Sequence, residues 1–307
     1  MQYNLIGDEI MVFKGSGVAL VTPFTDEDVY KINYDSFKDL IRFHINNSTD
    51  AIIVCGTTGE SATLTDEEKM KLFKCAVDTS SKRIPVIAGT GSNDTRHAIK
   101  LSIMAERLGV DALLIVTPYY NKCTQEGLIK HYNEIAKNVN IPIILYNVPS
   151  RTGLNILPKT VLELAKIPNV IGIKEASGNL EQVQEIIHLT KILDKEFAIY
   201  SGNDDQIYDI LDLGGDGVIS VLANVKPEAT HDICKSYFEG KKEKAKKLQE
   251  LYNPLVKALF NEVNPIPIKE ALNIEGLNVG FPRLPLTRCK EETKDVLEIE
   301  LKKTRKY

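Results

Sequence analysis

Residues 85–116 read PVIAGTGSNDTRHAIKLSIMAERLGVDALLIV, and this stretch decides the fold. The apolar runs at 85–88 and 111–116 are typical of strands buried on both faces. The amphipathic stretch at 94–108 has the period of a helix, and Asp94 occupies the N-cap position after a glycine-containing turn. The stretch therefore predicts a strand, a helix and a second strand parallel to the first.

The same alternation recurs along most of the chain. Strands are expected at Gly17–Val21, Ala51–Cys55, Pro85–Ala88, Asp111–Val116, Pro142–Tyr146, Val170–Lys174, Phe197–Tyr200 and Gly217–Val221. Amphipathic helices are expected between them, so a strand recurs roughly every 30 residues, as in consecutive βαβ units. Eight units predict an α/β protein with a closed (β/α)₈ barrel. A doubly wound open sheet is the alternative, but such sheets usually have fewer strands.

The pattern changes after Val221, where only helical periodicity remains. Helices are expected near 228–238, 241–260, 267–272 and 287–302. We therefore expect an N-terminal extension at 1–12, the barrel at 13–225 and a C-terminal helical region at 226–307.

Composition narrows the class of function. The chain has 307 residues, of which 43% are hydrophobic and 26% charged, as in ordinary globular proteins. Its net charge is 38 − 42 = −4, which gives no general attraction to nucleic acid or acidic lipid. Five cysteines without a C-x-x-C pair predict a reducing, cytoplasmic location, and no apolar run has the length of a signal peptide or membrane span. Small-molecule chemistry is the expectation.

A barrel of this kind builds its active site at the carboxyl ends of its strands. The segments expected there are CGTTGE (55–60), TPYYN (117–121), LYNVPSRTG (145–153), IGIKEASG (171–178) and YSGND (200–204). Lys174 shares a strand face with Gly172, so we expect it to point into the barrel. An unpaired buried ammonium favours its neutral form, and a neutral amine can attack a carbonyl to form an imine. The alternative is a structural lysine paired with Glu175 or another carboxylate.

Other side chains at these strand ends suit the same chemistry. The hydroxyls of Tyr146, Thr57 and Tyr120 could transfer protons, although packing or turn formation would also explain them. The guanidinium of Arg151 could hold a carboxylate by two bonds, or it could be a solvated surface group.

Two other classes of site are not expected. Residues 89–94 lack the third glycine of a dinucleotide-binding turn, and the segment after the eighth strand lacks a phosphate cradle. The five histidines form no zinc-binding motif, so we expect no metal.

Five motifs in order, GTTGESATL, TPYYN, LYNVPSRTG, IGIKEASG and GGDGVISV, resemble those of the pyruvate-dependent class I aldolases. Within that superfamily the chain is most similar to the dihydrodipicolinate synthases, from about Phe13 to at least Pro285. The resemblance implies condensation of pyruvate with L-aspartate 4-semialdehyde to 4-hydroxy-tetrahydrodipicolinate, with release of water, in the diaminopimelate route to lysine. It also implies that the enzyme needs no cofactor, because substrate pyruvate forms the imine.

The resemblance assigns a role to each candidate residue. Lys174 would form the pyruvate imine, and Tyr146, Thr57 and Tyr120 would relay protons. Tyr120 would reach the site of a neighbouring subunit in a homotetramer built from two tight dimers.

The resemblance also assigns the substrate-binding residues. The backbone N–H of Thr58 would hold the pyruvate carboxylate, and Arg151 would bind the carboxylate of the second substrate. Gly202 and Ile219 would line the site with backbone carbonyls.

Other functions remain possible at this point. N-acetylneuraminate lyase or a keto-deoxy-sugar aldolase would share the lysine and the tyrosine. These enzymes usually carry a Ser-Thr pair where this chain has Thr57 and Thr58, and they lack the arginine, so the synthase is favoured. A catalytically silent barrel that only binds a ligand is a further alternative, which the intact set of Lys174, Tyr146, Thr57 and Tyr120 argues against.

Regulation by lysine is a separate expectation. In feedback-inhibited relatives lysine binds at positions that match Ser61, Ala62, Asp66, Lys69, Asn93, His97 and Tyr119. An acidic residue is common where this chain has His97, and a histidine is common where it has Lys69. Cationic or neutral groups at these positions should hold an ammonium poorly, so we expect weak or absent inhibition by lysine.

Overall fold

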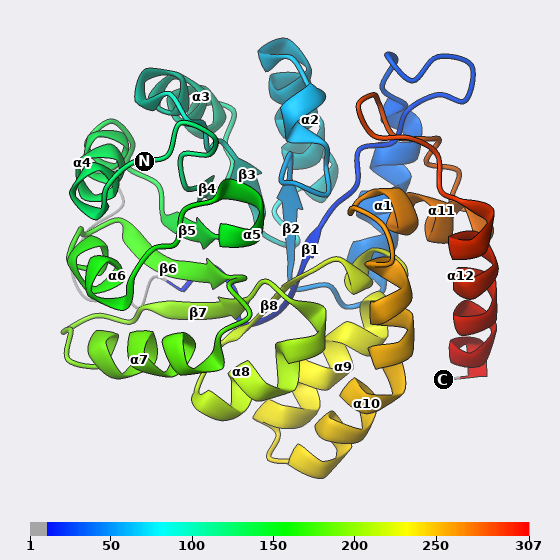
Figure 1. The fold of residues 1–307 in the computed structure, drawn as a ribbon. Helices are drawn as coiled ribbons and strands as arrows, with labels where there is room; N and C mark the ends of the chain where they lie inside the picture. Colours follow the sequence, from blue (N-terminus) through cyan, green and yellow to red (C-terminus); the bar gives the residue numbers. More distant parts are fainter. Residues whose placement is uncertain (1–10, 307) are drawn as a thin grey trace.

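The computed structural model describes residues 11–306, which form a closed barrel of eight parallel strands surrounded by helices (Figure 1). The strands follow one another in chain order, and β8 pairs with β1 to close the barrel. They are β1 (Gly15–Ala19), β2 (Ala51–Val54), β3 (Val86–Gly89), β4 (Ala112–Val116), β5 (Ile143–Asn147), β6 (Val170–Glu175), β7 (Ala198–Ser201) and β8 (Gly217–Ser220). The predicted (β/α)₈ barrel is confirmed.

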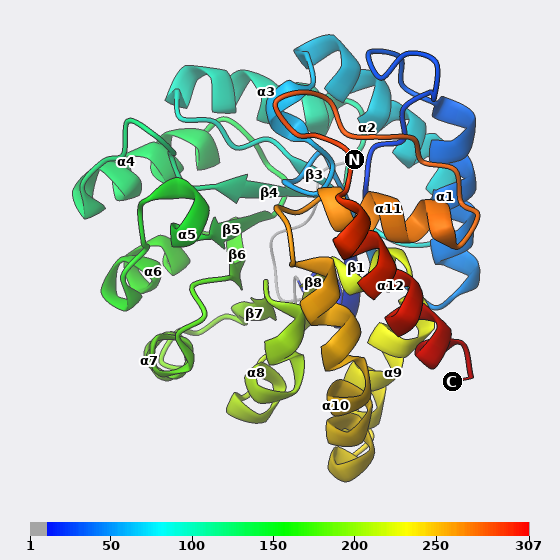
Figure 2. The same cartoon turned by 45° about the vertical axis from the view of Figure 1, so that its right-hand side comes forward.

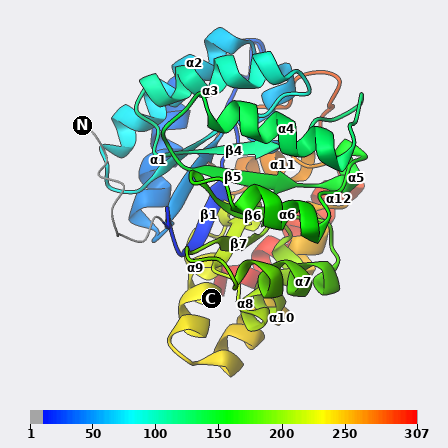
Figure 3. The ribbon, with the colours of Figure 1, turned by 90° about the vertical axis from the view of Figure 1, so that its left-hand side faces the viewer.

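Helices cover the outside of the strands, as the side view in Figure 3 shows. They are α1 (Tyr34–Asn46), α2 (Asp66–Ser80), α3 (Thr95–Arg107), α4 (Gln125–Ala136), α5 (Pro149–Thr152), α6 (Pro158–Ala165), α7 (Leu180–Thr190) and α8 (Ile207–Leu213). Short 3₁₀ turns are η1 (Ser61–Thr63), η2 (Asp204–Gln206), η3 (Leu222–Asn224) and η4 (Thr304–Lys306). The single turn α5 was not expected: Pro149 starts it, and Gly153 ends it with a φ of 71°.

Local signals in the sequence set the starts of two helices. The Thr65 hydroxyl accepts from the Glu68 N–H at 3.2 Å, and the Glu68 carboxylate accepts from the Thr65 N–H at 2.8 Å. This capping box satisfies two amide groups that the start of α2 would otherwise leave free. At α3 the Asp94 carboxylate accepts from the Arg96 N–H at 3.0 Å, which confirms Asp94 as the N-cap.

The first strand lies two residues earlier than the sequence predicts. The Gly15 N–H donates to the Asp216 carbonyl at 2.9 Å, and Gly15 is level with Gly217 of β8. A Cβ atom on Gly217 would lie 1.9 Å from the Gly15 carbonyl oxygen, so the two backbones can meet only because no side chain stands between them. The expected start at Gly17 was therefore wrong, because pairing with β8 extends β1 backwards.

The C-terminal region consists of α9 (Pro227–Phe238), α10 (Lys242–Leu259), α11 (Ile266–Ile274) and α12 (Glu291–Lys303). Helix α9 packs on β1 and α8, where the eighth helix of the barrel belongs. Helices α10, α11 and α12 pack on one another on one side of the barrel (Figure 2). The boundary at 225/226 stays a prediction, and α9, which follows that boundary, packs on the barrel itself.

Two sequence expectations concern the ends and the membrane. Of the expected extension at 1–12, only Met11 and Val12 lie among the described residues. Across residues 11–306, no helix combines the length and the apolar character that crossing a bilayer requires.

Apolar side chains fill the inside of the barrel and so determine which residues can face the site. Ile53, Ile87, Leu114, Ile144 and Ile219 belong to one buried cluster. In the same cluster the Phe13 ring stacks on Tyr200 with centroids 4.3 Å apart, and the Tyr200 hydroxyl donates to the Phe13 carbonyl at 2.6 Å. A polar side chain in such surroundings requires an explanation from chemistry or pairing.

Candidate active site

Lys174 lies near the carboxyl end of β6, inside the barrel, and only 5% of it is exposed. The sheet register places it beside Tyr146 of β5 and Tyr200 of β7, and both tyrosines belong to the interior cluster. Its Nζ lies 4.5 Å from the centroid of the Tyr146 ring. The expected inward direction of Lys174 is therefore confirmed.

Glu175 does not pair with Lys174, because alternation along the strand sends it to the opposite face. Its carboxylate accepts from Asn147 Nδ2 at 2.9 Å, Gln182 Nε2 at 3.3 Å and the Ser177 N–H at 2.6 Å. Burial raises the pKa of Glu175, although these hydrogen bonds oppose the rise. Among the described residues, none of the ion pairs includes Lys174, so the structure does not support the structural lysine paired with Glu175.

Gly202 lies against the lysine, and Ile219 lies in the buried interior of the barrel. A Cβ atom on Gly202 would lie 3.1 Å from Lys174 Cε and 2.6 Å from the Ala176 methyl group, so glycine leaves the room that the lysine side chain occupies. The Gly202 N–H donates to the Glu175 carbonyl at 2.7 Å, which holds the end of β7 against β6. Ile219 is fully buried on β8.

A buried carboxylate that the sequence analysis missed fixes the end of β8. Asp204 Oδ2 accepts from the backbone N–H groups of Val221 and Leu222, each at 2.9 Å. Burial raises the pKa of Asp204, against these bonds and the nearby charge of Lys174. An aspartate at the start of a helical pattern is usually an N-cap. The sequence therefore contained no signal that Asp204 points inward.

The two threonines lie in the turn that follows β2. The Thr57 carbonyl accepts from the Glu60 N–H at 3.0 Å, and Glu60 has a φ of 57°, so the turn is tight. Thr57 is half-buried, whereas Thr58 is buried and its Oγ1 accepts from Asn264 Nδ2 at 3.0 Å. The structure therefore ties this turn to the C-terminal region.

Arg151 lies on α5 and is exposed, with one anchoring contact. Its Nη2 donates to the Asn264 backbone carbonyl at 3.3 Å. Asn264, in the segment between α10 and α11, thus contacts both Thr58 and Arg151. The sequence analysis did not select it, because an asparagine before proline reads as an ordinary loop.

Tyr120 lies apart from the other candidates. It follows β4 in a loop, is 90% exposed and has a φ of 70°, which is unusual for a bulky residue. Within residues 11–306, no hydrogen bond or ring contact joins it to Lys174, Tyr146 or Thr57.

Several positions of the expected lysine site lie together. His97 Nε2 lies 2.9 Å from Asp66 Oδ1, and Lys100 Nζ lies 3.2 Å from Asp66 Oδ2. Partial burial opposes ionisation of Asp66, but hydrogen bonds from His97 and Lys100 outweigh it and lower its pKa. Asn93 Nδ2 donates to the Tyr119 carbonyl at 3.2 Å, Lys69 is buried in α2, and Ser61 and Ala62 lie in η1.

A second buried charge cluster joins the turn after β2 to the C-terminal region. Lys269 Nζ lies 2.6 Å from Glu60 Oε1, and the Arg283 N–H donates to Glu60 Oε2 at 2.9 Å. The Arg283 guanidinium donates to both oxygens of Glu68, at 2.7 and 3.0 Å. Burial lowers the pKa of Lys269 to about 8, against the attraction of Glu60. Sequence reasoning missed this cluster because its partners are more than 200 residues apart.

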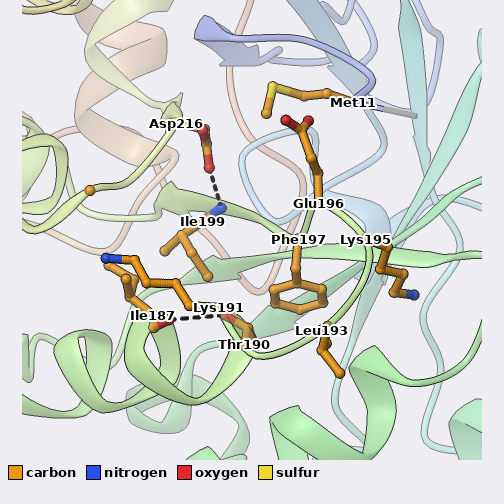
Figure 4. A pocket seen from close by; sticks show the side chains of 11 residues that line it. Met11, Ile187, Thr190, Lys191, Leu193, Lys195, Glu196, Phe197, Ile199 and Asp216 are labelled. Carbon is orange, nitrogen blue, oxygen red and sulfur yellow. Dashed lines mark hydrogen bonds between the residues drawn. The ribbon is translucent and has the colours of Figure 1, made fainter. Parts of the chain in front are cut away.

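The amino end of β7 holds a cavity of about 220 Å³ (Figure 4). Its lining includes Met11, Phe197 and Asp216, and none of the candidate site residues. Lys195 lines it too and donates to the carbonyls of Ile167 and Val170 at 2.6 and 2.9 Å. Burial lowers the pKa of Lys195 to about 8, but its amine is occupied by backbone carbonyls.

Metal binding was not expected from the sequence. Between residues 11 and 306 no three His, Cys, Asp or Glu side chains are grouped so that they could hold a metal ion.

Known proteins resemble the chain along nearly its whole length. The family described as "Dihydrodipicolinate synthetase family" matches residues 12–304. A 4-hydroxy-tetrahydrodipicolinate synthase of Caldicellulosiruptor bescii is 57% identical over 287 residues, which cover 94% of this chain and 95% of the relative. The enzyme of that name from Thermoanaerobacter pseudethanolicus is 55% identical over 293 residues, covering 95% and 97%.

The fold comparison agrees with the sequence comparison. The crystal structure of dihydrodipicolinate synthase from Thermotoga maritima superimposes with a TM-score of 0.92 at 44% identity, covering 95% of this chain and 98% of that one. Sequence and fold therefore agree, and the chain belongs to the dihydrodipicolinate synthetase family.

Proposed function

We propose that the chain condenses pyruvate with L-aspartate 4-semialdehyde to 4-hydroxy-tetrahydrodipicolinate, in the diaminopimelate route to lysine. The observation that carries the proposal is Lys174, which is buried in the barrel over the Tyr146 ring and forms no ion pair among the described residues, although its charge reaches the buried Asp204. A buried amine that is not held in an ion pair is suited to attack on a carbonyl. The names of relatives at 57% and 55% identity support the same reaction.

The reaction follows from the chemistry of an amine and a ketone. The Lys174 amine attacks C2 of pyruvate, water leaves and a C=N bond forms. Loss of a proton from the methyl group gives an enamine, whose carbon attacks the aldehyde and forms the new C–C bond. The amino group of the second substrate then attacks the imine carbon, closes the ring and releases the lysine. One water leaves overall, and no cofactor is needed because pyruvate itself carries the imine.

Three hydroxyls are proposed to move the protons. Tyr146 lies beside Lys174, and the half-buried Thr57 lies in the turn after β2. Tyr120 would complete the relay in a neighbouring subunit, within a homotetramer that is a dimer of dimers. Its 90% exposure in a single chain supports this arrangement, because an exposed and strained tyrosine gains a role if a second copy covers it.

Substrate recognition is assigned to the residues around the lysine. The Thr58 N–H holds the pyruvate carboxylate, Arg151 binds the carboxylate of the semialdehyde, and the Gly202 and Ile219 carbonyls line the site. The second candidate, an N-acetylneuraminate lyase or keto-deoxy-sugar aldolase, is disfavoured by Arg151, because a sugar tail needs hydroxyl-binding groups there. The cytoplasmic location and the independence from metal stay predictions.

Borohydride trapping tests the proposal. Incubation with pyruvate and borohydride, followed by peptide mapping, should place one reduced pyruvate adduct on Lys174 and none on Lys195 or Lys269, which serve as internal controls. Lys174→Ala should give no adduct. If the folded protein takes up no pyruvate at Lys174, the imine mechanism is wrong and the silent barrel replaces it.

A coupled assay then identifies the second substrate. Aspartate 4-semialdehyde should consume the pyruvate imine, and N-acetylneuraminate should release no pyruvate. The reverse result would assign the chain to the sugar aldolases.

A further inference from the structure

Asn264 lies where the two substrate-binding ends of the site meet the C-terminal region. It belongs to the segment that joins α10 to α11, drawn in orange in Figure 2. Its side-chain Nδ2 donates to Thr58 Oγ1 at 3.0 Å, and its backbone carbonyl accepts from Arg151 Nη2 at 3.3 Å. One residue therefore contacts both the turn after β2 and the arginine on α5.

The surroundings of Asn264 are costly for a residue that serves stability alone. The residue is 5% exposed, and its Oδ1 is buried without a hydrogen-bond partner in the described part of the chain. An unpaired buried acceptor destabilises the fold, and an apolar side chain of similar size would avoid that cost. The presence of an amide at this position therefore points to a role for its contact with Thr58 beyond stability.

The neighbouring charge cluster strengthens this argument. Lys269 and Arg283 already hold Glu60, at 2.6 and 2.9 Å, so the far end of the same turn is fixed without Asn264. Asn264 adds a hydrogen bond to Thr58, which precedes Glu60 by two residues in the turn. Its Nδ2–H uses a lone pair of the Thr58 hydroxyl and thereby sets the direction of that side chain and the position of its backbone N–H.

We propose that Asn264 is a positioning residue that couples the pyruvate end of the site, at Thr58, to the semialdehyde end, at Arg151. The inference rests on the proposed function, in which these two residues bind the two carboxylates. Loss of the Asn264 amide removes the contact with Thr58 directly, whereas the backbone carbonyl that accepts from Arg151 remains. The semialdehyde end should therefore be affected indirectly, because the segment that carries this carbonyl is no longer anchored to Thr58.

Steady-state kinetics of Asn264→Leu test the proposal. Because pyruvate binds and reacts before the semialdehyde, kcat/KM for pyruvate reports the first half of the reaction and kcat/KM for the semialdehyde reports the second. We expect kcat/KM for pyruvate to fall by about tenfold, the effect of losing roughly one hydrogen bond at Thr58, and kcat/KM for the semialdehyde to fall by a smaller factor of about three, because the backbone carbonyl that holds Arg151 is kept and only its anchoring is lost. We expect Tm to stay equal or rise, because the unpaired acceptor is gone; a merely structural role would lower Tm together with activity. Asn261→Ala, an exposed asparagine of the same segment, is the matched control.

Thr58→Val removes the acceptor of the same hydrogen bond. It removes Oγ1 with little change in shape, so the proposal predicts a fall in kcat/KM for the semialdehyde as well as for pyruvate. In the double variant with Asn264→Leu the losses should not multiply, because both changes remove one interaction.

The outcomes separate this inference from the proposed function. If Asn264→Leu keeps both kcat/KM values within about twofold of the parent, or if the losses in the double variant multiply, the coupling role is wrong. If Asn264→Leu does not fold, Thr58→Val decides alone, and an unchanged kcat/KM for the semialdehyde in that variant overturns the coupling. Failure of the parent protein to trap pyruvate at Lys174 would instead remove the proposed function.

Discussion

Lys174 in the barrel and Lys269 in the C-terminal region are two buried lysines with opposite surroundings. Each ammonium lies over an aromatic ring, Lys174 at 4.5 Å from the centroid of Tyr146 and Lys269 at 3.9 Å from that of Phe24. Lys269 also has Glu60 at 2.6 Å, whereas no ion pair among the described residues includes Lys174. Both lysines are buried, so burial does not distinguish them: the lysine in a direct ion pair supports the fold, and the lysine outside one is free to react.

Removal of the unpaired lysine should have the largest effect on activity. Lys174→Ala should lower kcat by at least roughly a thousandfold, because no other group can form the imine. Its Tm should fall less than that of Lys269→Met, since no direct ion pair is lost and only the longer-range attraction to Asp204 is removed. Activity assays and thermal unfolding of the same preparation check both statements, and substantial residual activity would break the comparison.

Removal of the paired lysine should act on stability instead. Lys269→Met leaves Glu60 as an uncompensated buried charge, so we expect the free energy of unfolding to fall by about 3–5 kcal/mol. The folded fraction should still trap pyruvate at Lys174. Denaturant unfolding measures the loss, and Glu60→Gln in the same chain should recover part of it by removing the stranded charge. A stable Lys269→Met protein without the adduct would contradict the assignment.

Two histidines extend the comparison to pH. Burial lowers the pKa of His44 from 6.5 to about 3, so its contribution to stability is complete above about pH 6.5 and declines as the pH falls. The decline is up to about 1.4 kcal/mol per pH unit. His231 is hydrogen-bonded to Asp50 at 3.0 Å, which raises its pKa, so its contribution is complete below about pH 6.5 and is lost as the pH rises past that raised pKa.

Urea unfolding at pH 5, 7 and 9 measures both effects. His44→Asn should flatten the loss of stability between pH 7 and 5. His231→Gln should weaken the protein at pH 5 more than at pH 9, by roughly 1 kcal/mol or less, because the pair is partly exposed. Parallel pH curves for parent and variants would show that neither the burial of His44 nor the pairing of His231 with Asp50 governs the pH dependence.

The smallest expected effect concerns a carboxylate that already has partners. His97 and Lys100 occupy both oxygens of Asp66, so it is poorly placed to receive a further ammonium. We expect less than half-inhibition at submillimolar lysine. His97→Glu should make the enzyme more sensitive by adding an acidic group and releasing Asp66. Strong inhibition of the parent would show that Asp66 exchanges its partners for the ligand.

The alternation of apolar runs and amphipathic helices was enough to predict the barrel, because each βα unit is a local pattern. The inward direction of Lys174 was also predictable, since it follows from period-two alternation beside Gly172. The contacts of Asn264, Lys269 and Arg283 were not predictable in the same way. They join residues more than 100 positions apart, and only tertiary packing brings them together.

The contacts of Asn264 and Arg283 also bear on how the chain is made. All eight strands lie before residue 221, so a growing chain carries the complete barrel sequence before the segment between α10 and α11 has been synthesised. The turn with Thr57 and Thr58 is fastened only when residues 264–283 arrive. During synthesis from the N-terminus, the barrel can therefore form before the site is finished. A shortened chain that ends after α9 would keep every candidate catalytic residue but lack the groups that hold this turn in place.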